Sequence, residues 1–300
     1  MAYRLEWEAS AGEELRRVAR EQIERGIEEL GGESPIGEKA HQVRKRCKKI
    51  RGLLRLYRPV IGKTYKKENR AFRDLGRRLA PTRDADSLLE TYDWLLHAYA
   101  DEIDRSRLGP LRRRLTEHRR HIHEELSAKE NLVESTRSGF QAALVRLAEW
   151  TPSNEGFAAV RGGLKKSYKR GHARLDELAG ASEPEPELTH EWRKRVKYHW
   201  YHVRLLEALW PELIGRRAEE VHRLSNYLGA ANDLAELQEA LRGEIGDQAS
   251  DERVAVVIGL AEQERRRLID EALPLGRLVF SQKPKDLVRQ ASGWWRPARG

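Results

Sequence analysis

Residues 41–48 read His41-Gln42-Val43-Arg44-Lys45-Arg46-Cys47-Lys48, and residues 190–197 repeat their basic positions as His190-Glu191-Trp192-Arg193-Lys194-Arg195-Val196-Lys197. The offset from His41 to His190, 149 residues, also aligns Leu15-Arg16-Arg17-x-x-Arg20 with Leu164-Lys165-Lys166-x-x-Lys169, and residues 79–84 with residues 228–233. Three separated segments rarely share one offset by chance. The chain is therefore predicted to hold two copies of one unit, residues 1–150 and residues 151–300. Two long copies favour two pseudo-symmetric helix bundles over a solenoid, which needs about three or more short repeats.

Helical periodicity runs through nearly the whole chain. Leu, Ala and Val recur three and four residues apart, with long charged side chains between them. Helix ends are expected at 31–37, 59–62, Pro81, 109–110, 151–152 and Pro211, and in the Pro- and Glu-rich loop 180–187. Alternating strand patterns are absent from the sequence, so an all-α fold is predicted.

The charge balance indicates an anionic partner. The chain has 57 Lys and Arg against 48 Asp and Glu, a formal net charge of +9. Such an excess suits nucleic acid, an acidic membrane surface or a phosphate polymer, and does not choose among them. Cys47 is the only cysteine, which excludes an intrachain disulfide and a cysteine-based metal site. A charged N-terminus and the absence of a long apolar segment lead us to expect a cytoplasmic protein.

The repeated segments predict two amphipathic helices, each with one basic face. On a helical wheel, the apolar side of residues 41–58 holds Val43, Cys47, Ile50, Leu53, Leu54 and Tyr57. The opposite side, with no acid, holds His41, Arg44, Lys45, Lys48, Arg51 and Arg55. In the second copy the apolar side holds Trp192, Val196, Val203, Leu206 and Trp210. Its basic side holds His190, Arg193, Lys194, Lys197 and Arg204.

These basic faces predict a bound anion. Like charges at helical spacing repel by about 0.2–0.5 kcal/mol per pair, and ordinary solvated faces mix signs. Two such faces indicate a bound anion, whose attraction to the cations replaces their mutual repulsion. The alternative is a plain solvated surface. His41 and His190 take equivalent places on them. We predict that both contact phosphate, as imidazolium or as neutral donors, and the alternative is a helix-terminal or core histidine.

A third basic element follows at residues 161–170. It contains Arg161, Lys165, Lys166, Lys169 and Arg170 without an acid. Its first-copy counterpart, Arg16-Arg17-x-x-Arg20, is diluted by Glu13, Glu14 and Glu21, which leaves its role open. Residues 83–86 and 232–233 carry acids, which we interpret as helix N-caps or as acids that orient a neighbouring arginine.

Patterns typical of enzymes are weak. His118-x-x-His121-x-His123 has suggestive spacing, but neighbouring arginines disfavour a divalent cation. The sequence has no Gly-rich phosphate loop and no nucleophile with a plausible base. We therefore expect no catalytic residue, no metal and no cofactor.

The basic helix pair resembles the CHAD family, whose name refers to conserved histidines in an α-helical domain. Leu228-Gly-x-x-Asn232-Asp233, its Arg83-Asp84 counterpart and Gly163-Leu164-Lys165-Lys166-Ser167-Tyr168 are similar to that family as well. The resemblance covers residues 8–295. It implies two four-helix bundles related by a pseudo-two-fold axis, whose basic helices line a central groove or pore and bind inorganic polyphosphate. The implied contacts are His41, Arg44, Lys45, Lys48, Arg51, His190, Arg193, Lys194 and Lys197, with Lys165 and Lys169 from the second basic element. Pro81 departs from the small residue that many relatives have there.

These observations predict non-catalytic binding of inorganic polyphosphate, with association to polyphosphate granules. The predicted contacts are the family positions together with Arg55 and Arg204. The first alternative is sequence-independent RNA binding, which shares the electrostatics but usually adds aromatic stacking platforms. The second alternative is a metal-dependent phosphohydrolase. No membrane partner is expected.

Overall fold

The computed structural model describes residues 3–128, 131–181, 185–243, 245, 251–296 and 298. In these ranges all regular secondary structure is helical, which confirms the predicted all-α class. The first half contains α1 (Ala11–Gly31), α2 (Ile36–Tyr57), α3 (Gly62–Arg78), α4 (Ala80–Ala98), α5 (Gly109–Ser127) and α6 (Leu132–Arg146). The second half contains α7 (Gly156–Ala179), α8 (Pro186–Leu205), α9 (Pro211–Arg242), α10 (Glu252–Val279) and α11 (Pro284–Trp295). Short 3₁₀ turns are η1 (Arg105–Leu108), η2 (Leu147–Glu149) and η3 (Glu207–Leu209).

The helices fall in the same order in the two halves, close to the offset of 149 residues. The helices α1 and α2 correspond to α7 and α8, the pair α3 and α4 to α9, and α5 and α6 to α10 and α11. The two halves differ at the junction of α3 and α4. Leu79 follows the last residue of α3, and Pro81 lies in the first turn of α4. The equivalent positions are Leu228 and Ala230, and α9 continues through them without a break. A proline fits the first turn of a helix but interrupts its interior, which explains the split. The pseudo-two-fold relation between the halves stays a prediction.

The predicted helix ends are confirmed where the structure describes them, and α1, α2 and α8 end or begin at the expected breaks. Part of the expected loop 180–187, residues 182–184, lies outside the described residues. The apolar sides of α2 and α8 are buried as predicted, apart from Trp210, for which the prediction was wrong. Trp210 is 46% exposed because α8 ends at Leu205 and the turn η3 interrupts the helical periodicity before it.

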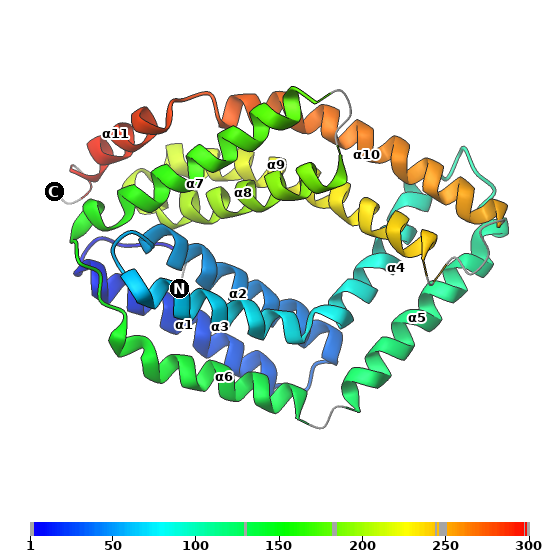
Figure 1. Cartoon of the computed structure of the whole chain (residues 1–300), viewed down its shortest axis with the longest axis horizontal. Helices are drawn as coiled ribbons and strands as arrows, with labels where there is room; N and C mark the ends of the chain where they lie inside the picture. The colour runs from blue at the N-terminus through cyan, green and yellow to red at the C-terminus, as the bar shows by residue number, and fades with distance from the viewer. Residues whose placement is uncertain are drawn as a thin grey trace.

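The helix α2 lies at the centre of the molecule and packs against α1, α3, α4, α7 and α8 (Figure 1). It meets α8 at Gly52, where an added Cβ would lie 3.0 Å from Tyr201, and the buried His202 Nε2 donates to the Gly52 carbonyl at 3.0 Å. It meets α7 at Gly163, where an added Cβ would lie 1.9 Å from the Leu56 carbonyl oxygen. These approaches hold the basic helices α2, α7 and α8 side by side. In the described part of the chain, no helix has the length and apolar character needed to cross a bilayer.

We expect Gly163→Ala to lower the free energy of unfolding by roughly 3 kcal/mol, because the new methyl group would force α7 away from the backbone of α2. Gly215→Ala is the matched control, since it lies within α9 and a Cβ there meets no atom within 4 Å. The control should raise the free energy of unfolding by about 0.5–1 kcal/mol through helix propensity. Denaturant unfolding of the two variants measures both effects. Equal effects would contradict the packing argument.

Candidate functional site: a basic groove

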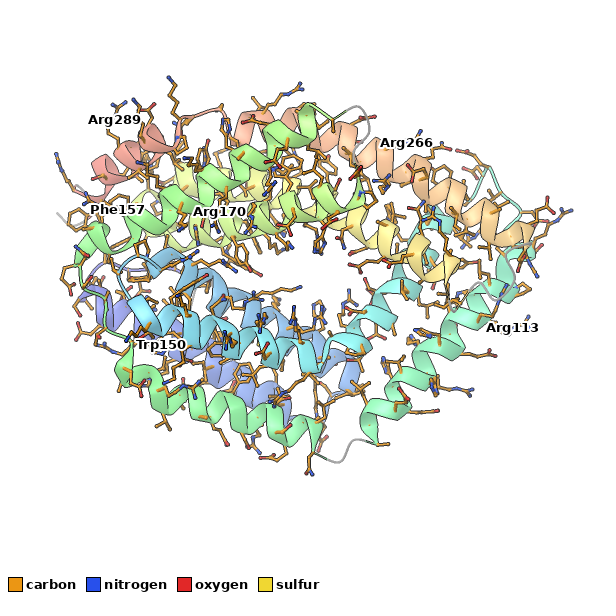
Figure 2. All side chains as sticks on the ribbon, viewed as in Figure 1. Arg113, Trp150, Phe157, Arg170, Arg266 and Arg289 are labelled. Atoms are coloured by element: carbon orange, nitrogen blue, oxygen red, sulfur yellow. The ribbon has the colours of Figure 1, made fainter. Side chains whose placement is uncertain are left out.

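Two adjoining cavities lie between the halves of the molecule. The first, of about 570 Å³, is lined by α2, α4, α8 and α9, and the second, of about 760 Å³, is lined by α2, α3, α4, α8 and α9. Both are lined by Arg44, Lys48, Arg193 and Lys197, so we treat them as one site and call it the basic groove. Figure 2 shows side chains of α2, α4, α8 and α9 that point into the opening between these helices.

The basic groove brings together ten of the predicted contacts from segments 149 residues apart. Besides the four shared cations, the first cavity is lined by His41, Lys45 and Arg204. The second cavity is lined by Arg51, His190 and Lys194. Arg55 lines a separate small cavity at the C-terminal end of α2. Lys165 and Lys169 are exposed on α7 and line none of these three cavities.

The prediction of two basic faces without any compensating acid was wrong in part. Arg44 Nη2 lies 3.2 Å from Asp84 Oδ1, and Arg193 Nη2 lies 3.8 Å from Asp233 Oδ1. Lys194 pairs with Glu191, one turn earlier on α8. The acids of the first two pairs come from α4 and α9, so a wheel of α2 or α8 alone does not show them.

These ion pairs also decide how the acids at residues 84 and 233 are interpreted. Their placement beside arginines confirms that they can orient a neighbouring guanidinium. The N-cap interpretation was wrong, because α4 begins at Ala80 and α9 begins at Pro211, which leaves both acids inside helices.

Other groove cations have no carboxylate partner in the described part of the chain. Lys45, Lys48, Lys197 and Arg204 form no ion pair with a described residue, and neither does Lys49, a buried groove residue that the sequence analysis missed. Desolvation, followed by the charge of the nearby Arg193, lowers the pKa values of Lys48 and Lys197 to about 8. Lys48 nevertheless remains exposed to the solvent in the groove. Burial, followed by the charge of Arg46, lowers the pKa of Lys49 to about 8. The groove therefore concentrates positive charge, and at Lys49 and Lys197 this charge is poorly solvated.

Aromatic rings hold several of these cations in place. Lys197 Nζ lies 4.3 Å from the centroid of the Trp200 ring, and Arg204 Cζ lies 5.4 Å from the same ring. Trp200 in turn stacks on His222, with the ring centroids 4.5 Å apart. Cation–π contacts restrict side chains without neutralising them, so the charges stay available to a ligand.

The two repeated histidines both line the basic groove, and they have different neighbours. His190 Nδ1 donates to Asn232 Oδ1, and Asn232 Nδ2 donates to Glu236 Oε1 at 2.6 Å. This chain fixes the imidazole and leaves Nε2 for the second cavity. Desolvation, followed by the charges of Arg83 and Lys45, lowers the pKa of His41. These effects favour the neutral imidazole of His41 in the free protein, and its ring N–H can still donate a hydrogen bond.

The groove contains residues that the sequence analysis missed. Arg83 had been assigned to a capping segment, but it lines the first cavity and pairs with Glu90 at 2.8 Å. Arg83 lies in residues 79–84, which match residues 228–233 at the offset of 149, and this match could have identified it as a site residue. Trp200 lies three residues after Lys197 and four before Arg204, so helical spacing could have placed it among these cations. Arg73 and Arg77 come from α3, and no pattern in the sequence connects them to α8.

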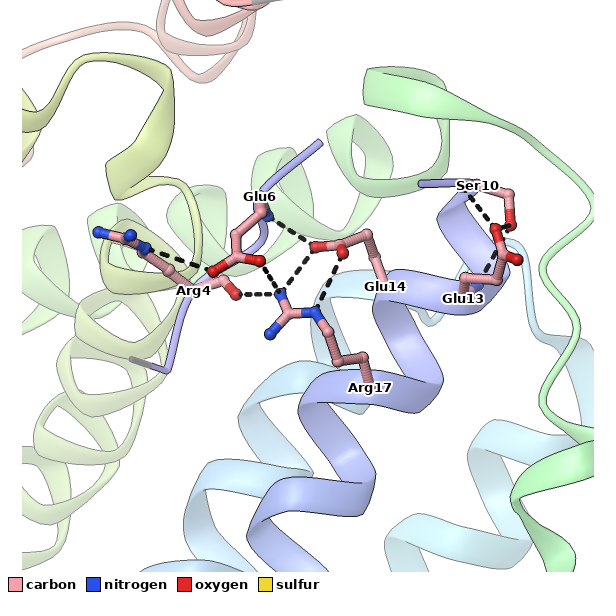
Figure 3. Close-up of polar contacts among 6 residues, drawn as sticks. All are labelled: Arg4, Glu6, Ser10, Glu13, Glu14 and Arg17. Carbon is pink, nitrogen blue, oxygen red and sulfur yellow. Dashed lines mark hydrogen bonds and ion pairs between the residues drawn. The ribbon is translucent and has the colours of Figure 1, made fainter. Parts of the chain in front are cut away.

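The first-half basic element is compensated by acids (Figure 3). Arg17 Nη2 lies 2.9 Å from Glu14 Oε2 and 3.8 Å from Glu6 Oε2, and it donates to the Arg4 carbonyl at 2.8 Å. Arg16 donates to the Trp150 carbonyl at 3.2 Å. These side chains tie α1 to the preceding segment and to the end of the first half, which is a structural role.

The histidines of α5 do not assemble a metal site with their neighbours. His123 Nε2 lies 3.1 Å from Asp86 Oδ1, and His121 Nε2 lies 3.8 Å from Glu125 Oε1. Among the residues that the structure describes, no group of three or more His, Cys, Asp or Glu is placed to hold a metal ion. Cys47 is buried against the core, and this burial raises the pKa of its thiol to about 12.

Comparisons with known proteins agree with this architecture. The structure is similar to the crystal structure of the CHAD domain from the plant Ricinus communis, with a TM-score of 0.66, 18% sequence identity and coverage of 94% of this chain and 95% of that one. It is also similar to PptA from Streptomyces chartreusis, with a TM-score of 0.61, 16% identity and coverage of 91% and 100%. No curated protein sequence matches the chain. The model of the CHAD domain family matches residues 10–242, and the chain belongs to this family.

Proposed function

We propose that the protein binds inorganic polyphosphate in the basic groove and does so without catalysis. The observation that carries this proposal is the convergence of cations from both repeats on one groove. Lys45, Lys48, Lys197 and Arg204 have no described carboxylate partner there. Membership of the CHAD family supports polyphosphate as the phosphate polymer.

The geometry favours an extended polyanion over a single small anion. The cations are distributed along α2 and α8 and line two joined cavities, so one phosphate group cannot meet them all. A polymer meets them through many weak contacts, and each contact releases a condensed counterion. The groove offers Lys, Arg and His without an arrangement that would read base edges, which suits a polymer made only of phosphate.

RNA is the second candidate, and Trp200 is the observation that favours it. Single-strand binding proteins stack bases on aromatic rings beside a basic track, and Trp200 is a half-buried ring in the wall of the first cavity. However, one side of this ring is already engaged by His222, and Lys197 and Arg204 lie close to it. The site therefore uses the ring mainly to position its own side chains.

Titration with polyphosphates of graded length, at low and at high salt, tests the proposal. We expect affinity to rise with chain length and to fall steeply with salt. RNA at matched phosphate concentration serves as competitor and should displace polyphosphate poorly. Preferential binding of RNA, or affinity that does not depend on polymer length, would contradict the proposal.

The absence of catalysis is a separate expectation with its own measurement. Incubation of the protein with polyphosphate in the presence of Mg²⁺ or Mn²⁺ should release no orthophosphate beyond the protein-free control. Turnover that depends on the protein would replace binding with hydrolysis as its function. Binding alone would associate the protein with polyphosphate granules in the cytoplasm, which co-localisation with stained granules would test.

A further inference from the structure

A third cavity lies outside the basic groove, where the C-terminal end of α2 meets α7 and α8. Its lining includes two side chains from the end of α2, two from α7 and one from α8, all of them cations. They are Arg55, Arg58, Lys166, Arg170 and Arg195, and we call this set the α7 cluster. Ser167 and Tyr198 complete the lining. Arg195 is paired with Glu191, whose Oε2 lies 3.0 Å from Arg195 Nη2, and the other four cations form no ion pair with a described residue.

The packing of α7 on α2 forces these cations together. The absence of a side chain at Gly163 lets the two backbones approach, since a Cβ there would lie 1.9 Å from the Leu56 carbonyl oxygen. At this distance Lys166 and Arg170, one and two turns further along α7, come next to Arg55 and Arg58. Burial, followed by the charges of Arg195 and Arg58, lowers the pKa of Arg170. The cations therefore repel one another in the free protein.

Aromatic side chains hold the α2 members of the cluster in fixed positions. The Arg55 guanidinium lies 4.1 Å from the centroid of the Tyr198 ring, and its Nη1 donates to the Tyr65 hydroxyl at 3.0 Å. Arg58 lies 4.8 Å from the centroid of the Tyr65 ring. The Nε of Arg55 is buried without a hydrogen-bond partner. These contacts restrict the two guanidinium groups without neutralising their charges.

The α7 cluster adjoins the basic groove. Tyr198 lines both the third cavity and the second cavity of the groove. Arg51, which lines the groove, precedes Arg55 by one turn on the same face of α2. A polymer that leaves the groove past Tyr198 therefore meets the α7 cluster next.

We propose that the α7 cluster is a second phosphate site, which takes the segment of polyphosphate that leaves the basic groove past Tyr198. The inference rests on the proposed function and adds a specific consequence to it. A polymer long enough to reach both sites gains contacts that a short oligophosphate in the groove does not make. The α7 cluster thus sets a preference for long chains.

The test compares two double variants with the same change in charge. Lys166→Gln/Arg170→Gln removes two cations of the cluster, whereas Lys283→Gln/Lys285→Gln removes two cations at the start of α11 that line none of the three cavities. All four side chains are exposed. We expect the first variant to bind long-chain polyphosphate about tenfold more weakly, with a salt dependence reduced by about one unit of slope per lost contact. The second should stay within about twofold of the wild type. Both should bind tripolyphosphate like the wild type.

Several outcomes would overturn the inference. Equal losses in the two double variants would show that only net charge matters, and a loss confined to tripolyphosphate would show a site for free short phosphates. Thermal unfolding without ligand checks the fold, and Lys166→Gln/Arg170→Gln should melt at or above the wild-type temperature because repulsion is relieved. Should that variant misfold, the single changes Arg170→Gln and Lys285→Gln repeat the comparison. If the groove variant Lys48→Glu/Lys197→Glu kept wild-type affinity, the proposed function itself would fail, which is a separate result.

Discussion

The variant Lys48→Glu/Lys197→Glu is expected to bind long-chain polyphosphate at least about 1000-fold more weakly than the wild type. Both lysines line both cavities of the basic groove, one from each repeat. A hydrogen bond to a charged group contributes about 1.5–3 kcal/mol, and each tenfold change in affinity corresponds to about 1.4 kcal/mol. Loss of two such contacts gives at least a hundredfold, and the introduced carboxylates add repulsion that accounts for the rest.

The matched control is Lys283→Glu/Lys285→Glu, which makes the same change in net charge on exposed positions at the start of α11. Its affinity should fall only through the general field of the protein, by about tenfold or less at physiological salt. Circular dichroism should show unchanged helicity in both variants, because neither lysine pair contributes to the buried apolar side of its helix. Equal losses of affinity would show that the polymer is held by overall charge and not by the groove.

The fold was largely predictable because its signals are local. The spacing of Val43, Cys47, Ile50 and Leu54 defines the buried side of α2 without knowledge of any other helix. The shared offset of 149 residues then predicts an equivalent helix that begins near His190, and the same binding role for the basic sides of the two helices. Trp210 shows the limit of this reasoning, because a short 3₁₀ turn ends the periodicity just before it.

The details of the site depend on contacts between helices, which a single sequence does not reveal. Lys165 and Lys169 on α7, which the family resemblance implies, stay predicted contacts. Lys166 and Arg170 line the third cavity, because the contact of Gly163 with α2 sets which side of α7 faces Arg55. The acids that pair with Arg44 and Arg193 were hidden for the same reason. Periodicity shows that a helix has a basic side, and tertiary packing decides which of its cations meet.

Binding of long-chain polyphosphate is expected to weaken about 100-fold between pH 7 and pH 9. Lys49 and Lys197 have pKa values of about 8 in the free protein, and Lys48, also at about 8, contributes less because the solvent in the groove screens it. A bound polyanion favours the charged lysine and raises its pKa again. Each such lysine therefore takes up a proton on binding above pH 8, and two of them account for a loss of about tenfold each over this range.

The stability of the free protein should respond to pH in the opposite direction. Since burial lowers the folded-state pKa of Lys49 and Lys197 below the value of 10.5 in the unfolded chain, the unfolded state binds more protons between about pH 8 and pH 10.5. Their contribution to stability therefore rises with pH in the window where affinity falls. A loss of affinity at high pH can thus be distinguished from unfolding. Calorimetric titrations at pH 8 in two buffers of different ionisation enthalpy should detect net proton uptake. Lys49→Gln/Lys197→Gln should remove most of this uptake, whereas Lys283→Gln/Lys285→Gln should keep it. Affinity that stays constant up to pH 9.5 would mean that these lysines do not touch the polymer.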